Sequence, residues 1–176
     1  MSKAKTGSDW TYKIYFYPRA DKYDGGPAVP ISDEELIEKL STQVDVDEDI
    51  VKVYVYKSAL VTFQLTKAIL CHMFVVFETV DWWWSIEKNA QGITLQRSTS
   101  RNDVKKKYRQ EDRIQHTSIE LVEKDRGRKN MRQLIEMLWK ENELNHRYGF
   151  LDSNCKDFAK VVFDYAARSK TLEFVI

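Results

Sequence analysis

Short stretches of the chain alternate hydrophobic and polar residues with a period of two or are dense in β-branched and aromatic residues, as is typical of β-strands. These stretches are 11–17, 49–66, 71–79, 82–89, 93–96 and 116–122. Only Val80 and Asp81 separate the third stretch from the fourth, and these two strands with the fifth predict an antiparallel meander. The second half of 49–66 also fits a buried helix, because short apolar runs are ambiguous.

Two segments combine helical periodicity with a capping box, in which a polar side chain and a residue three positions later satisfy each other's backbone N–H groups. Ser32 with Glu35 has this spacing and predicts a short helix beginning directly after Ser32. Asn130 with Gln133 has it too, and apolar residues follow at i, i+3, i+4, i+7 and i+8. This second pattern predicts an amphipathic helix running to about Asn145.

The last predicted helix begins at a cysteine. Ser153 or Asn154 can cap a helix from Cys155 to about Arg168, whose apolar residues recur on one face. Cys155 then lies in the first helical turn, where unsatisfied N–H groups and the helix dipole favour a thiolate.

Composition supports one folded domain. The chain has 176 residues, 43% of them hydrophobic, with only 3 Pro and 6 Gly, so it can bury a substantial core. Together with the predicted strands and helices, this indicates an α+β domain with a mostly antiparallel sheet on which the two C-terminal helices pack.

Charge is nearly balanced, with 28 Lys and Arg against 27 Asp and Glu, a formal net charge of +1. No global attraction to polyanions follows, so nucleic acid is not an expected partner. The segment 97–113 carries mixed charge without an apolar period and predicts a solvated loop. Its basic residues leave a polyanion-binding adaptor as a weaker alternative function.

Other motifs narrow the class of protein. The apolar run 59–77 is interrupted by Gln64, Lys67 and His72, so no transmembrane segment is expected. Two cysteines are too few for a disulfide scaffold and the first ten residues lack a secretory signal, which favours a cytoplasmic location. Glycine-rich phosphate loops and zinc motifs do not occur, so neither a cofactor nor a metal is expected. The oligomeric state stays open.

A nucleophilic cysteine needs a base within hydrogen-bond reach, and a third group usually orients that base. The histidines are His72, His116 and His146. The last two lie beside a charged loop and at the polar end of a helix, contexts typical of exposed residues. His72 heads a strand of core residues, where a polar ring needs a partner or a function. A structural and a catalytic role for His72 both stay open on these residues alone.

Strand register offers candidates to orient that imidazole. A two-residue turn at 80–81 would place His72 opposite Asn89, with Glu87 and Ser85 further along the same face. A three-residue loop would reverse the parity and remove all three candidates.

Four further residues are candidates for substrate contact, whereas the second cysteine, Cys71, is expected to have a structural role. Trp82, Trp83 and Trp84 could line an acyl or peptide groove, although alternate aromatics in a strand more often pack in a core, and we expect core packing for at least one face. Asn154, next to the nucleophile, is the fourth candidate. Cys71 points away from His72, because side chains alternate along a strand, and is expected to be a small core residue.

The segment around Cys155 resembles a known motif. Tyr148, a step of several residues to Asn154 and Cys155, and then Phe158 are similar to the Asn-Cys box of the permuted papain-like enzymes, the lecithin:retinol acyltransferase-like group. The resemblance covers about 70–167 and implies a circularly permuted papain-like fold, with Cys155 as nucleophile and the upstream His72 as base.

The chain departs from that family at two points. Trp84 stands where the acyltransferase group has a second histidine, so the third role passes to Asn89, Glu87 or Ser85, or is absent. The family's C-terminal membrane anchor has no counterpart in the last residues, which favours a soluble peptide, amide or thioester over a phospholipid. Residues 1–60 are not explained by the resemblance and are expected to be an N-terminal extension packed on a core of 61–176.

These observations predict a cysteine-dependent acyl-group hydrolase or transferase acting on a peptide, protein or acyl substrate, a thiol protease by the preferred interpretation. Cys155 attacks the carbonyl, His72 transfers the proton, the backbone N–H groups at the helix start stabilise the oxyanion, and Tyr148 lends a further donor. One alternative is a non-catalytic protein-interaction module with the same fold. A second is a phospholipid or thioester acyltransferase.

Overall fold

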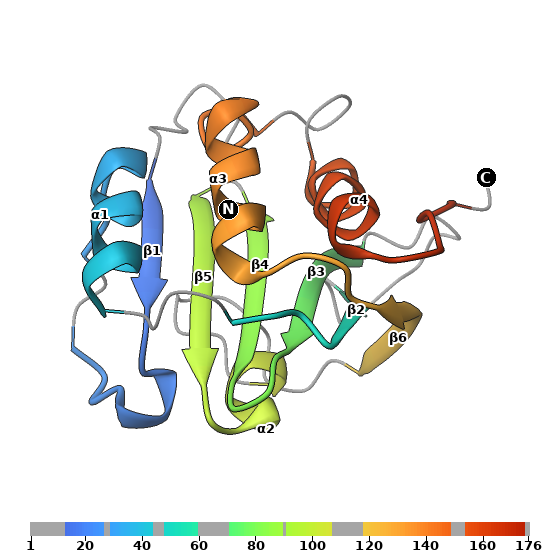
Figure 1. Ribbon diagram of the computed structural model, residues 1–176, viewed down its shortest axis with the longest axis horizontal. Helices are drawn as coiled ribbons and strands as arrows, with labels where there is room; N and C mark the ends of the chain where they lie inside the picture. The colour runs from blue at the N-terminus through green and yellow to red at the C-terminus, as the bar shows by residue number, and fades with distance from the viewer. Residues whose placement is uncertain are drawn as a thin grey trace, which may run out of the picture.

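The computed structural model shows strands and helices arranged around one mixed sheet (Figure 1). It describes residues 13–26, 29–43, 48–59, 71–89, 91–106, 118–148 and 154–174. The elements are β1 (Ile14–Tyr17), the 3-10 helix η2 (Ala20–Lys22), α1 (Asp33–Gln43), β2 (Lys52–Ala59), β3 (Cys71–Glu78), β4 (Trp83–Asn89), β5 (Gly92–Ser98), α2 (Arg101–Lys106), β6 (Ile119–Arg126), α3 (Met131–Lys140) and α4 (Cys155–Ala166). In this part of the chain, no helix is long and apolar enough to cross a membrane.

The six strands lie in the order β1-β5-β4-β3-β2-β6. Every neighbouring pair is antiparallel except β1 and β5, which run parallel. The predicted meander is therefore confirmed as β3, β4 and β5, and the fold class is α+β with a mostly antiparallel sheet. The first and second strands, both from residues 1–60, belong to the same sheet as the rest.

A glycine lets β1 approach β5 closely. Gly92 has a φ of +143°, and a Cβ there would lie 2.1 Å from the carbonyl oxygen of Lys13. The next residue, Ile93, donates its N–H to that same oxygen at 2.9 Å. A larger residue at 92 would push the edge strand away from the sheet.

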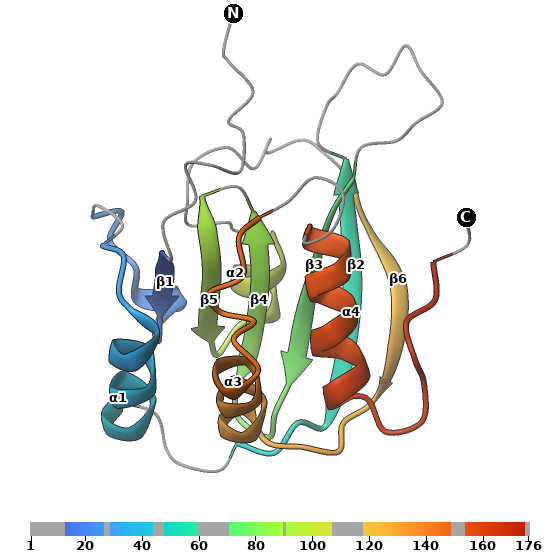
Figure 2. The ribbon, with the colours of Figure 1, turned by 90° about the horizontal axis from the view of Figure 1, so that it is seen from above.

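The two faces of the sheet are covered differently (Figure 2). Helices α1, α3 and α4 lie over one face and α2 over the other. Side chains alternate accordingly along β3: Met73, Val75 and Phe77 join the large core beneath α3 and α4, whereas Phe74 and Val76 join a smaller aromatic cluster on the α2 face.

All three predicted helix caps are observed, at Ser32, Asn130 and Asn154. Ser32 Oγ accepts from the N–H of Glu35 at 3.1 Å. At the start of α3, Asn130 Oδ1 accepts from the N–H of Gln133 at 2.8 Å, and Gln133 reciprocates at 3.2 Å. The α3 helix ends at Lys140, short of the predicted residue 145, and Asn142 then adopts a left-handed φ of 61° in a series of turns.

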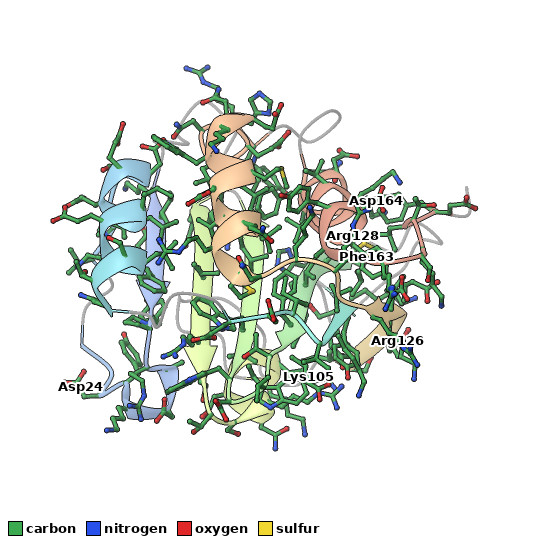
Figure 3. All side chains as sticks on the ribbon, in the orientation of Figure 1. Asp24, Lys105, Arg126, Arg128, Phe163 and Asp164 are labelled. Atoms are coloured by element: carbon green, nitrogen blue, oxygen red, sulfur yellow. The ribbon has the colours of Figure 1, made fainter. Side chains whose placement is uncertain are left out.

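The C-terminal end of α4 is held by an arginine from another segment. Arg128 donates from Nε to the carbonyl of Tyr165 and from Nη2 to that of Asp164, both at 2.9 Å, and Figure 3 shows Arg128 beside Asp164. A cation at this end satisfies the last carbonyls and complements the helix dipole. The helix ends at Ala166, two residues before the predicted end.

The prediction of a solvated loop over 97–113 is wrong for its described part. Arg97 lies in β5 with 5% of its surface exposed, and 101–106 form α2. Arg97 Nε donates to Glu48 Oε1 at 2.9 Å, and its guanidinium lies 3.4 Å from the centre of the Trp82 ring. A distant carboxylate and an aromatic face offset the cost of burying this charge. Residues 107–113 lie outside the described part.

Two other strand predictions are partly tested. The strand expected over 49–66 is β2 in its first half, and 60–66 lie outside the described residues. The strand expected over 116–122 begins three residues later, as β6. His116 is also outside the described part.

Candidate active site

The candidate nucleophile lies at the start of α4, next to β3. Asn154 caps this helix: its Oδ1 accepts from the N–H groups of Lys156 at 2.8 Å and Asp157 at 3.2 Å, and Asp157 Oδ2 accepts from the N–H of Asn154 at 3.4 Å. This third capping box was missed in the sequence, although the Asn-x-x-Asp spacing carries its signal. The cap places Cys155 in the first turn with 5% of its surface exposed.

The sulfur of Cys155 lies against the backbone of β3. Sγ is 3.8 Å from the carbonyl oxygen of Cys71 and also interacts with the backbone N–H of Met73. The ladder between β3 and β4 runs from Glu78 opposite Trp83 only as far as Val75 opposite Ile86. Cys155 therefore meets β3 beyond the part of the strand that pairs with β4. This backbone contact has no signal in the sequence.

His72 and Glu87 form a buried pair across β3 and β4. The imidazole Nε2 lies 2.6 Å from Glu87 Oε2, and these residues are 8% and 1% exposed. The His72 ring also stacks on Phe74, with ring centres 6.4 Å apart, which places it on the α2 face. Glu87 engages Nε2 of the imidazole, and the Cys155 thiol interacts with the same ring and favours its protonated form.

The two-residue turn that gave these candidates is confirmed. The N–H of Thr79 donates to the carbonyl of Trp82 at 2.9 Å, so Val80 and Asp81 form the expected two-residue turn. The ladder keeps the expected register as far as Val75 opposite Ile86, and the expected pairing of His72 with Asn89 lies beyond its end. The Glu87 side chain nevertheless reaches the His72 imidazole.

Of the three candidates for orienting His72, the structure brings Glu87 to the imidazole. The other two have different hydrogen bonds: Asn89 Oδ1 accepts from the N–H of Gln91 at 2.8 Å, and Ser85 Oγ accepts from Gln96 Nε2 at 3.1 Å.

Electrostatics favour a charged cysteine–histidine pair. Burial opposes protonation of His72, but its hydrogen bonds to Cys155 and Glu87, and the negative charges of both, outweigh burial and raise the pKa of the imidazole to about 9. Burial likewise opposes ionisation of Cys155, but the hydrogen bond and charge of His72 prevail and lower the pKa of the thiol. Both shifts favour the thiolate–imidazolium form of the pair over the neutral form.

Tyr148 also lies at the nucleophile. Its hydroxyl interacts with the sulfur and with the backbone N–H of Cys155, and its pKa is raised to about 12 by burial and by the nearby cysteine. The N–H groups of Lys156 and Asp157 are used by the Asn154 cap. Among the helix-start donors expected to stabilise an oxyanion, the N–H of Cys155 interacts with the Tyr148 hydroxyl, which lies beside the candidate nucleophile.

The tryptophans lie far from this centre. Trp82 and Trp83 are half-buried, and Trp84 is fully buried and donates from Nε1 to Glu48 at 2.5 Å. Trp82 lies opposite Thr79 across the hairpin turn, and Thr79 is seven residues further along the chain than His72. In an extended strand this spacing separates Trp82 from His72 by about 20 Å. The structure does not bring these three residues to Cys155, and the Asn154 side chain is occupied with the cap.

The remaining histidine and cysteine have ordinary surroundings. His146 is exposed and lies 3.5 Å from Glu143. Cys71 packs half-buried against the core beneath α4, on the opposite face from His72 as expected. Among the described residues, no group of three or more His, Cys, Asp or Glu side chains could hold a metal ion.

Comparisons of this chain with protein-family models, with curated proteins and with solved structures found no match. The resemblance of the Asn-Cys segment to the permuted papain-like enzymes therefore stays a prediction. The fold and the residues at Cys155 carry the functional argument.

Proposed function

We propose that this protein is a cysteine-dependent acyl-group hydrolase or transferase, with Cys155 as nucleophile, His72 as general acid and base, and Glu87 as the residue that positions His72. The observation that carries the proposal is the buried series Glu87, His72, Cys155, in which Nε2 of the imidazole lies 2.6 Å from the carboxylate and the ring is hydrogen-bonded to a thiol of lowered pKa. Each neighbour has the type and position that nucleophilic catalysis requires.

In the first step the Cys155 thiolate attacks the carbonyl carbon of the substrate. A carbon–sulfur bond forms, and the carbonyl π electrons move to oxygen. In this proposal the Tyr148 hydroxyl, which interacts with the backbone N–H of Cys155 at the start of α4, donates to that oxyanion.

The intermediate then collapses and the leaving group departs. The His72 imidazolium gives its proton to the departing nitrogen, sulfur or oxygen, and an acyl-thioester remains on Cys155. In hydrolysis, neutral His72 next accepts a proton from water, which attacks the thioester and releases the acid. An acceptor alcohol, thiol or amine in place of water gives transfer instead.

The arrangement also agrees with the permuted papain-like interpretation. A strand histidine precedes a helix-start cysteine in the chain, the cysteine helix packs on an antiparallel sheet, and the histidine's carboxylate partner comes from the next strand. A peptide, isopeptide, amide or thioester bond is the preferred substrate over a phospholipid, as in the sequence analysis.

Capture of the acyl-enzyme tests the proposal. The Cys71→Ala protein, which retains one cysteine, is mixed with small activated thioesters and amides, and its intact mass is followed with time. We expect a transient mass increase equal to the acyl group, located on Cys155 and absent in Cys155→Ala and His72→Gln. Absence of any adduct, together with an ordinary thiol pKa, would favour the non-catalytic interaction module.

A further inference from the structure

The contact with Glu87 fixes one atom of the His72 ring. The imidazole Nε2 lies 2.6 Å from Glu87 Oε2. A planar ring held at one atom can still rotate about the line of that contact, because the second side-chain torsion of histidine is broad. The direction in which the rest of the ring points therefore depends on what lies against its faces.

A phenylalanine ring lies against the imidazole. Phe74 follows His72 by two residues on β3 and is on the same face of the sheet. The two ring centres are 6.4 Å apart, and 17° separates the two ring planes. Aromatic rings in this offset, nearly parallel arrangement attract each other. Phe74 thus restricts the plane of the imidazole, whereas Glu87 restricts the position of Nε2.

The position of Phe74 is fixed in turn by a second ring. Phe74 is fully buried and lies directly opposite Tyr56 on β2, with ring centres 5.7 Å apart and 27° between the planes. Tyr56 is 2% exposed, its hydroxyl accepts from Arg101 of α2, and Lys105 Nζ of the same helix lies 4.6 Å from the centre of its ring. Three rings from two strands therefore lie in series, and α2 packs against the end far from His72. In such a close-packed row, Phe74 cannot shift without displacing its neighbours.

We propose that Phe74 is a positioning residue of the active site, whose ring fixes the plane of the His72 imidazole and so directs it at the Cys155 thiol. This inference rests on the proposed function, because it assigns Phe74 to the same cysteine–histidine centre. Among the described residues, the titratable groups that act on the imidazole are Glu87 on β4 and Cys155 on α4. Phe74 adds a neutral surface that sets the geometry of this charged series.

The test measures the pH dependence of Cys155 alkylation by iodoacetamide in the Cys71→Ala background. Phe74→Leu keeps an apolar side chain and removes the flat ring. We expect alkylation at pH 6 to slow about fivefold, with the midpoint of the profile about 0.7 pH units higher, because an imidazolium in the wrong plane stabilises the thiolate less well. Phe74→Tyr keeps the ring and should stay within about twofold of the parent.

A matched control separates this role from general loosening of β3. Phe77 is also fully buried on β3, but it belongs to the large core on the opposite face of the sheet. Phe77→Leu should therefore leave the alkylation profile unchanged, and an equal shift in both leucine variants would overturn the assignment of Phe74. Phe74→Met should show the same shift as Phe74→Leu, which keeps the test valid if the leucine variant folds poorly, because methionine fills irregular gaps in a core.

A double-mutant cycle locates the effect on His72. In a His72→Gln background, Phe74→Leu should cause no further slowing, because the imidazole that it positions is gone. An unchanged profile in Phe74→Leu, or equal slowing with and without His72, overturns the assignment of Phe74. If the parent protein itself shows an ordinary thiol profile, the proposed function fails first, so the two failures are distinguishable.

Discussion

Glu48 and Glu87 both contact a buried basic side chain of the sheet. Glu48 does so near the turn of the β3–β4 hairpin, and Glu87 near the open end of that hairpin. Glu48 binds Arg97, and the two side chains are 10% and 6% exposed. Glu87 binds His72, at 1% and 10%. Their burial is similar, but a guanidinium stays charged at every accessible pH, whereas an imidazole exchanges its proton near neutrality.

The side chains around the Glu48–Arg97 pair and the Glu87–His72 pair also differ. Arg97 lies over the Trp82 ring, and Glu48 also accepts from the Trp84 indole, so this pair ties the hairpin turn to the core. His72 instead adjoins a thiol whose pKa it lowers. A buried ion pair thus indicates chemistry only where one member can titrate and a nucleophile lies beside it.

The largest expected effect is the loss of stability when the buried pair of Glu48 and Arg97 is broken. Glu48→Ala leaves the buried Arg97 charge uncompensated and should lower the free energy of unfolding by about 3 kcal/mol. Denaturant unfolding measures this. The exposed pair of Lys57 and Glu120, 3.1 Å apart, supplies the control, since Glu120→Ala should cost under about 1 kcal/mol. Equal losses in the two variants would remove the distinction.

Next in size is the loss of the base. His72→Gln should slow alkylation of Cys155 at pH 6 by about 100-fold, because it removes the imidazolium that stabilises the thiolate. Stopped-flow labelling in the Cys71→Ala background gives the rate. The same substitution of exposed His146 should leave it unchanged, and slowing in both variants would argue against a specific pair.

His72 also makes a pH-dependent contribution to stability. Its folded pKa, about 9, exceeds its ordinary value of 6.5, so protonated His72 stabilises the fold fully below about pH 6.5, and this contribution is lost as pH rises through 9. The stability difference between parent and His72→Gln should therefore shrink from pH 6 to pH 9.5. Chemical denaturation at both pH values measures it, and a difference that grows would contradict the raised pKa.

A smaller effect is expected at the positioning carboxylate. Glu87→Gln keeps the shape and can keep a hydrogen bond but removes the charge, so alkylation at pH 6 should fall about tenfold, less than in His72→Gln. Ser85→Ala, on the same strand and face, is its control. A profile identical to the parent would mean that Glu87 does not set the charge state of His72.

Tyr148 should affect turnover and leave thiol activation nearly unchanged. In Tyr148→Phe we expect alkylation within about twofold of the parent and acylation by a thioester slowed about tenfold or more, since one oxyanion donor is lost. Comparing both rates in one preparation checks this. Parallel loss of both rates would instead assign Tyr148 to thiolate stabilisation.

How much of this site the sequence could predict depends on the range of each interaction. The Asn154 cap, the first-turn position of Cys155 and the two-residue turn at 80–81 are local, and all three are observed. The turn also narrowed the partner of His72 to three side chains on one face, including the observed Glu87.

Contacts between residues far apart in the sequence could not be predicted from local sequence patterns. Arg97 was assigned to a solvated loop because its partner Glu48 is 49 positions away. Local sequence likewise could not show that the β3–β4 ladder ends at Val75, so that Cys155 contacts β3 beyond it. Nor could it show that the tryptophans pack about 20 Å from the site.

The most direct test of the central claim is the pH profile of Cys155 alkylation between pH 5 and 10 in the Cys71→Ala protein. The account predicts rapid labelling at pH 6, with a midpoint well below the ordinary thiol value of about 8.5, and loss of that labelling in His72→Gln. A midpoint near 8.5 that is indifferent to His72 would contradict an activated cysteine–histidine pair and leave a non-catalytic interaction module as the better interpretation of the fold.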